Sequence, residues 1–165
     1  MQPVVHVAEQ AEYLKARRCG RIVVERGRLD AVYGRWWPHE TSLLEVYWDR
    51  WRRNYTSDRC ELFYHAPWGS SRYLTLSYVR SGPETSLSTF YAATLVLDEI
   101  ARLKDSNAIV CNVTNVRISD RLMTRWGWVT HCESWKGRHF IKRLYGKHPE
   151  IPGVWRERLK LGSTA

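Results

Sequence analysis

The segment that most constrains the fold of this chain is residues 87–105, LSTFYAATLVLDEIARLKD. Its apolar side chains lie on nearly every face of the expected helix as far as Asp98, and a helix of that kind is buried. The segment that follows, 107–115, is short and mainly apolar, which is typical of a strand. A buried helix that leads into a strand predicts an α/β fold with a sheet to cover the helix.

Two segments before this helix predict an antiparallel hairpin. Residues 60–65 and 72–79 are rich in aromatic and aliphatic side chains, and the APWGSS between them has the composition of a turn. Nearer the N-terminus, apolar residues at helical spacing predict a helix over 7–18. A short strand begins at Arg21 and ends at Gly27.

The C-terminal third predicts a short helix and a second hairpin. Residues 118–126 carry apolar side chains on one face, and Gly127 ends the helix where a left-handed residue costs least. Residues 129–134 and 138–145 are strand-like. We expect the basic tail after Pro149 to be peripheral.

The length of 165 residues indicates a single domain. It divides into a helical and basic part at 1–55, a core at 60–145 and the tail at 149–165. The net charge is +9, from 26 Lys and Arg against 17 Asp and Glu. Such a surface attracts anions, so nucleic acid is one possible partner, as are a phosphorylated cofactor and an acidic protein.

A second basic feature is the segment 41–55, which also carries several Trp and Tyr residues. It predicts a helix with aromatic side chains on one side and arginines on the other. Two interpretations stay open. The aromatic and basic surface contacts a partner or stacked bases, or the aromatics belong to the core and the arginines are solvated, which we favour.

The four cysteines exclude some classes of protein. None of them is part of a C-x-x-C pair, so we expect no zinc ribbon, no thioredoxin-type site and no metal. The N-terminus lacks the pattern of a secretory signal, and no apolar run is long enough to cross a membrane. We therefore expect a cytoplasmic protein with reduced thiols and no membrane partner.

The order of elements from 60 to 145 resembles the GNAT superfamily of acyl-CoA-dependent N-acetyltransferases. The likeness is strongest from 112 to 145, where Asn115, the short helix and the pair Gly127-Trp128 match the Asn, helix and Gly-aromatic pair of that family. The resemblance implies a single GNAT-like α/β domain with a mixed, mostly antiparallel central sheet flanked by helices. It also implies that strand 107–113 lies parallel to strand 72–79 and then splays from it.

Two departures from the family pattern bear on activity. The family binds the cofactor pyrophosphate in a loop of the form Q/R-x-x-G-x-G/A, whereas residues 80–89 hold one glycine, Gly82, followed by Pro83, which has no N–H to donate. The family also commonly has a Tyr that protonates the leaving thiolate, and here that position is Met123, which cannot donate a proton.

The candidate catalytic residues are His65 and Tyr78, near the ends of the two arms of the first hairpin. A proton acceptor that works near neutral pH is best supplied by His. A structural role in the sheet is the alternative for both, because the strands are crowded with aromatic side chains.

The candidate cofactor-binding residues lie further along the chain. The hydroxyls of the loop before the long helix can donate to a phosphate or cap the helix, and the resemblance implies that Asn115 bonds the pantetheine arm. The set is Val79, Ser86, Ser88, Thr89 and Asn115. The expected cofactor is acetyl-CoA or another acyl-CoA.

Two functions follow as hypotheses. The first is an N-acyltransferase that moves an acyl group, in particular acetyl, from CoA to an amine on a small molecule or a protein. The alternative is a catalytically silent GNAT-like protein that binds nucleic acid or a protein through its basic, aromatic surface. The missing glycine loop and Met123 favour the alternative.

Overall fold

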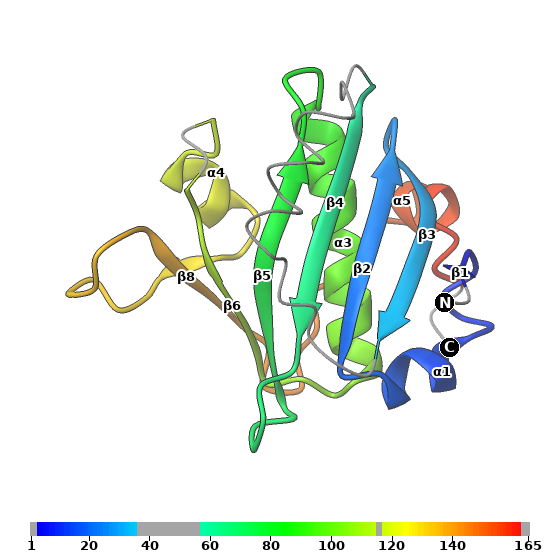
Figure 1. Ribbon diagram of the computed structural model, residues 1–165, viewed down its shortest axis with the longest axis horizontal. Coiled ribbons are helices and arrows are strands. Elements are labelled where there is room, and N and C mark those ends of the chain that lie inside the picture. Colours follow the sequence, from blue (N-terminus) through cyan, green and yellow to red (C-terminus); the bar gives the residue numbers. More distant parts are fainter. Residues whose placement is uncertain (1–2, 36–56, 115–116, 163–165) are drawn as a thin grey trace.

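The computed structural model describes residues 3–35, 57–114 and 117–162, which include eight strands in one mixed sheet (Figure 1). The strands are β1 (Pro3–Val4), β2 (Cys19–Glu25), β3 (Arg28–Arg35), β4 (Arg59–His65), β5 (Tyr73–Ser81), β6 (Ala108–Asn112), β7 (Val129–Thr130) and β8 (His139–Arg143). The helices are α1 (Ala11–Ala16), α3 (Leu87–Leu103), α4 (Asp120–Arg125) and α5 (Gly153–Arg158).

The strands follow the order β1-β3-β2-β4-β5-β6-β8-β7 across the sheet. Every neighbouring pair is antiparallel except β5 and β6. The prediction of an α/β fold with a mixed, mostly antiparallel sheet flanked by helices is confirmed.

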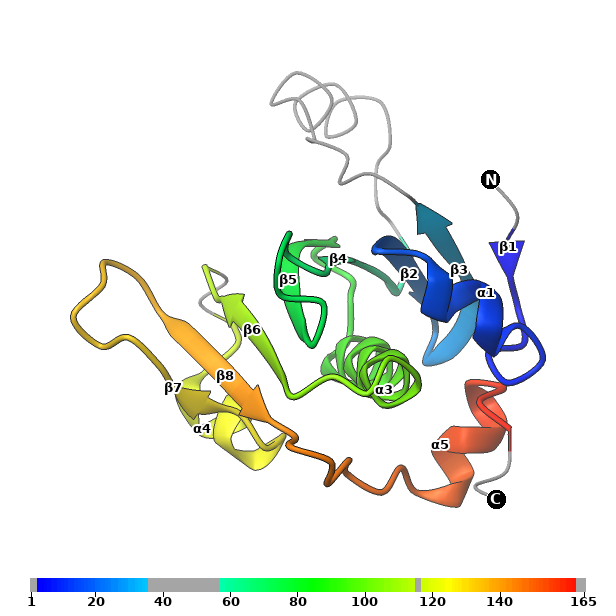
Figure 2. The ribbon, with the colours of Figure 1, turned by 90° about the horizontal axis from the view of Figure 1, so that it is seen from below.

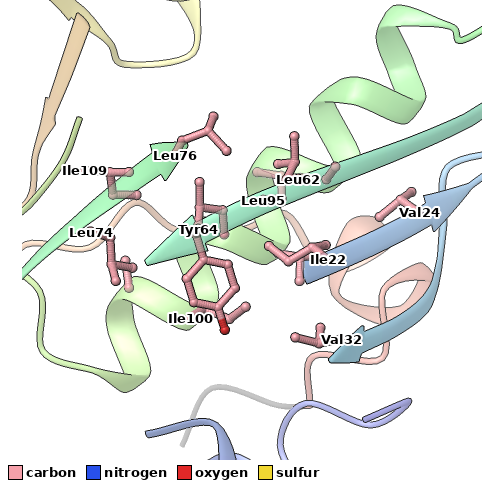
Figure 3. Packing of buried hydrophobic residues seen from close by; sticks show 14 of the residues in the cluster. Ile22, Val24, Val32, Leu62, Tyr64, Leu74, Leu76, Leu95, Ile100 and Ile109 are labelled. Atoms are coloured by element: carbon pink, nitrogen blue, oxygen red, sulfur yellow. The ribbon is translucent and has the colours of Figure 1, made fainter. Parts of the chain in front are cut away.

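The long helix α3 is buried, as its sequence predicts. All of its residues from Ala92 to Ala101 are buried, and they pack against one face of the sheet. Figure 3 shows Leu95 and Ile100 of this helix among side chains from β2 to β6, such as Ile22, Leu62 and Ile109. Figure 2 shows α3 and α4 on the same face of the sheet.

The parallel pair holds together at one end only. Its register runs from Tyr73 opposite Ala108 to Leu76 opposite Cys111, while β5 continues to Ser81. Figure 1 shows the two strands diverging beyond that point. The prediction that these strands are parallel neighbours that then splay is confirmed.

The strand β3 was not expected from the sequence. It pairs with β2 through a two-residue turn at Arg26 and Gly27, whose φ angles are 50° and 69°. A turn with two positive φ angles matches the twist of the flanking strands. The sequence pattern indicates Gly27 only as the end of a strand, whereas in the structure the same glycine belongs to the turn that leads into β3.

The expectation that the C-terminal tail is peripheral is wrong. Ile151, Leu159 and Leu161 belong to the hydrophobic core. The guanidinium of Arg156 in α5 lies 3.3 Å from the buried carboxylate of Glu99 in α3. The tail is mostly basic, and its apolar residues are too few to give a periodic pattern in the sequence. In the structure these residues pack into the core, which also includes Val4 of β1.

The smaller elements agree with the predictions in kind and differ in length. The first helix spans Ala11–Ala16 only, and the strands of the last hairpin are shorter than predicted. The helix α4 begins at the side-chain cap of Ser119 and ends before Gly127, which has a φ of +83°. The predicted helix at 41–55 lies outside the described residues.

Candidate functional site

The divergence of β5 from β6 leaves a cavity of about 330 Å³. Its walls come from five parts of the chain: β5, the first turns of α3, the end of β6 with the two residues after it, the segment from Ile118 to Met123 in α4, and Trp128. Most of the wall is apolar, and a few hydroxyls and backbone groups interrupt it. A concave apolar site with few polar groups is the usual form of a small-molecule site.

The β5 wall of this cavity contains a β-bulge. Phe63 lies opposite Tyr78 and Tyr64 lies opposite Leu76, so Ser77 has no opposing residue on β4. A bulge leaves backbone groups outside the ladder and re-aims the side chain. Ser77 lines the cavity, so the irregular backbone forms part of its wall.

The bulge links His65 to the cavity. The Nδ1 atom of His65 lies 2.6 Å from the Oγ atom of Ser77. Desolvation by burial, followed by the positive charge of Arg18, lowers the pKa of His65 below its ordinary 6.5. Arg18 is held in place by hydrogen bonds to the carbonyl oxygens of Ala66 and Pro67, at 3.1 and 2.7 Å. The imidazole is therefore neutral at pH 7 and able to accept a proton.

Two other candidate residues lie directly in the cavity wall, Tyr78 and Val79. The ring of Tyr78 packs against Phe63 with 6.0 Å between centroids. Of the candidates named from the sequence, the structure thus brings Tyr78 and Val79 together in the cavity wall. His65 lies outside that wall and contacts Ser77, which is part of it. Asn115 lies outside the described residues.

The hydroxyls of Ser86 and Thr89 at the start of α3 donate hydrogen bonds to a carboxylate of the same chain, that of Asp58. The Asp58 carboxylate accepts hydrogen bonds from the Ser86 N–H at 2.8 Å, the Ser86 hydroxyl at 3.0 Å and the Thr89 hydroxyl at 2.8 Å. Desolvation alone raises the pKa of Asp58, but these hydrogen bonds and the charge of Arg26 outweigh it and lower the pKa below 3.8. Ser86 also caps the helix by accepting from the Thr89 N–H.

Gly82, Pro83 and Thr85 of the loop before α3 are also hydrogen-bonded within the chain. The N–H of Gly82 donates to the hydroxyl of Thr85, at 2.9 Å. On the side of α4, the loop presents carbonyl oxygens: Arg117 donates to those of Pro83 and Thr85, both at 3.2 Å. Ser88 is exposed on the first turn of the helix, outside the cavity wall.

The far wall of the cavity carries Met123 and Trp128, which are 3% and 2% exposed. The thioether of Met123 therefore occupies the wall itself, where it cannot donate a proton. Burial raises the pKa of the neighbouring Cys111 thiol to about 12, so this thiol stays protonated and is a poor nucleophile.

A metal centre finds no support in the part of the chain that the structure describes. No group of three or more His, Cys, Asp or Glu side chains there is arranged to hold an ion. None of the helices in the same ranges combines the length and the apolar character needed to cross a bilayer.

Two residues of the site were missed by the sequence reasoning. The sequence pattern indicates an ordinary strand position for Ser77, because a bulge is a property of strand pairing and has no local signature. Asp58 precedes its strand without any pattern, and its partner Ser86 lies 28 residues away. Only the packing of β4 beside α3 joins them.

Comparisons with known proteins leave the family of this chain open. No family model matches the sequence, and the searches of curated proteins and of solved structures found no match.

Proposed function

We propose that the protein is a GNAT-like acyltransferase that transfers an acyl group from a CoA thioester to an amine. The observation that carries this proposal is the apolar cavity between the splayed ends of β5 and β6, walled by the bulge at Ser77. An apolar cleft accepts an acyl chain and a pantetheine arm, and backbone N–H groups outside the ladder can polarise a thioester carbonyl.

The reaction is direct attack of a neutral amine on the thioester carbonyl. The new C–N bond forms and the C–S bond breaks. The proton from the amine passes to the hydroxyl of Ser77, whose own proton moves to Nδ1 of His65 across 2.6 Å. Solvent protonates the leaving thiolate, because Met123 cannot donate. The protein thus contributes positioning, carbonyl polarisation and a proton acceptor.

Calorimetric titration with acetyl-CoA, with CoA as the control ligand, tests the proposal first. Binding with a Kd in the micromolar range, followed by thiol release in the presence of an amine panel, is the expected result. No heat and no thiol release with acetyl-CoA at millimolar concentration would refute an acyl-CoA-dependent activity.

A second candidate is a GNAT-like protein without catalysis that binds a partner. Two observations favour it: Asp58 fills the helix terminus where the family binds phosphate, and Met123 stands in the cavity wall in place of a proton donor. The net charge of +9 then serves an acidic partner. Binding of single-stranded RNA or DNA that weakens steeply with salt, without acetyl-CoA binding, would support this candidate.

A further inference from the structure

The N-terminal end of α3 holds an internal anion, the carboxylate of Asp58. A helix begins with N–H groups that have no partner within the helix, and the helix dipole makes this end attractive to negative charge. Here the Asp58 carboxylate already lies at that end, where it accepts one hydrogen bond from the backbone N–H of Ser86 and two from the hydroxyls of Ser86 and Thr89, between 2.8 and 3.0 Å. Asp58 therefore stands where an external phosphate would find its donors.

The donors around Asp58 are satisfied as a group. Thr89 is fully buried, and its hydroxyl accepts from the N–H of Gly27 at 2.9 Å while it donates to Asp58. The N–H of Thr85 donates to the carbonyl of Gly82 at 3.1 Å. A phosphate at this place would have to displace a carboxylate that Ser86 and Thr89 hold with three hydrogen bonds.

The side of the loop that faces α4 also has the wrong polarity for a phosphate. It offers the carbonyl oxygens of Pro83 and Thr85, which are hydrogen-bond acceptors, and both receive bonds from Arg117. Arg117 is an exposed cation, so its attraction for a phosphate is weak and screened by salt.

We infer that this protein selects its acyl donor by the pantetheine arm and the acyl group, and that the diphosphate of CoA contributes little to binding because Asp58 occupies its place. This inference rests on the proposed function. It names the donor class as pantetheine thioesters in general, whether or not the pantetheine carries the nucleotide of CoA.

The test compares two donors that differ only in the phosphate-bearing nucleotide. Acetyl-CoA and S-acetyl-pantetheine are titrated by calorimetry into the full-length protein at about 150 mM salt, where exposed charges are screened. We expect Kd values within about threefold of each other, because the exposed cation Arg117 adds only a weak attraction for the phosphates of CoA. At higher salt this attraction is screened, so the Kd values of the two donors should become equal.

Other outcomes separate this inference from the proposed function. If acetyl-CoA binds about thirtyfold or more tightly than S-acetyl-pantetheine, direct phosphate contacts exist, and the inference fails while the acyltransferase proposal stands. If neither thioester binds at millimolar concentration, both fail.

A variant gives the second arm of the experiment. Asp58→Ala vacates the helix terminus, so acetyl-CoA should bind about tenfold more tightly than in the wild type while S-acetyl-pantetheine is unchanged. Asp58→Asn, which keeps the shape and removes the charge, should give a smaller gain and serves if the alanine variant does not fold. Asp105→Asn removes the same charge at the other end of α3, and it should change neither affinity. Equal affinities for acetyl-CoA in folded Asp58→Ala and wild type would overturn the role of Asp58.

Discussion

The backbone lacks regular hydrogen-bond partners at two places. One is the gap between β5 and β6, and the other is the N-terminal end of α3. At the gap, the parallel register stops at Leu76 and Cys111, and the space beyond stays open as a cavity. At the helix terminus, Asp58 takes up donors that the helix leaves unpaired. Buried backbone polar groups must find partners. The chain therefore supplies the partner itself at the helix terminus, whereas the proposed function assigns the cavity to the acyl donor.

Filling the cavity should have the largest effect. Val79 lies in its wall on β5, and a strand tolerates an aromatic residue. Val79→Trp places an indole in the space for the donor, so acetyl-CoA affinity measured by calorimetry should fall about a hundredfold or more.

The matched control for this variant is Val129→Trp on β7, where the valine is 46% exposed and outside the cavity wall. It should bind like the wild type. A folded Val79→Trp protein with unchanged affinity would show that the donor binds elsewhere.

Removing the proton acceptor should affect turnover and leave binding alone. Glutamine at position 65 keeps a hydrogen bond to Ser77 but cannot take its proton. We expect His65→Gln to lower kcat about a hundredfold with the donor Kd unchanged, measured by thiol release and calorimetry. His139→Gln, on β8, is the control. Full turnover by His65→Gln would show that another group accepts the proton, and Tyr78 in the cavity wall would be the next candidate.

The pH dependence of turnover follows from the lowered pKa of His65. Only the neutral imidazole accepts a proton, so kcat/KM should rise with pH through a pKa below 6.5 and then level off. With an acceptor amine that stays unprotonated above about pH 5, the fall on the acid side should approach tenfold per pH unit. The His65→Gln variant should lose this limb. A wild-type limb with its midpoint above pH 6.5, or an acid limb that persists unchanged in His65→Gln, would contradict the assignment.

The smallest expected effect concerns stability at the filled site. Asp58→Asn keeps one acceptor but loses the charge, so it should lower the free energy of unfolding by about 1 kcal/mol, a modest value because Asp58 is only half-buried and solvent screens its charge. Urea unfolding at pH 7 measures this loss, with Asp105→Asn as the control.

The same pair of proteins has a distinctive acid response. The pKa of Asp58 is lower in the folded state than the ordinary 3.8, so its contribution is complete above about pH 3.8 and disappears as the pH falls through the lowered folded pKa. The stability difference between the wild type and Asp58→Asn should shrink in that acid range. A difference that is constant down to pH 2 would mean that the charge of Asp58 adds no stability.

Local patterns predicted the regular parts of the fold well, because each carries its signal in neighbouring residues. The buried helix around Ala92–Ala101, the hairpin of β4 and β5 and the glycine stop at Gly127 follow from periodicity and turn chemistry. The return strand Arg28–Arg35 and the buried residues of the tail, such as Leu159, were missed. Both depend on what the segment packs against.

In the candidate site, too, the sequence indicated some residues and left the partners of others undetermined. The sequence indicated His65 and Tyr78 as candidate proton acceptors and Val79 as a candidate cofactor-binding residue. Tyr78 and Val79 line one cavity, and His65 contacts Ser77 in its wall. It grouped Ser86, Ser88 and Thr89 as a possible phosphate cradle from their hydroxyls alone. The hydroxyl of a capped helix terminus looks the same in a sequence whether its partner is a ligand or a carboxylate of the same chain.

The sequence by itself determined most of the segments that form helices and strands, because hydrophobic periodicity and turn residues act over a few neighbouring positions. The parallel pairing of two strands around the buried helix was implied by the family resemblance, and the structure has that pair. Only the tertiary structure decided that Ser77 bulges toward His65 and that Asp58 occupies the start of α3. Both result from strand register and from contacts between distant segments, which the chain settles when it packs its core.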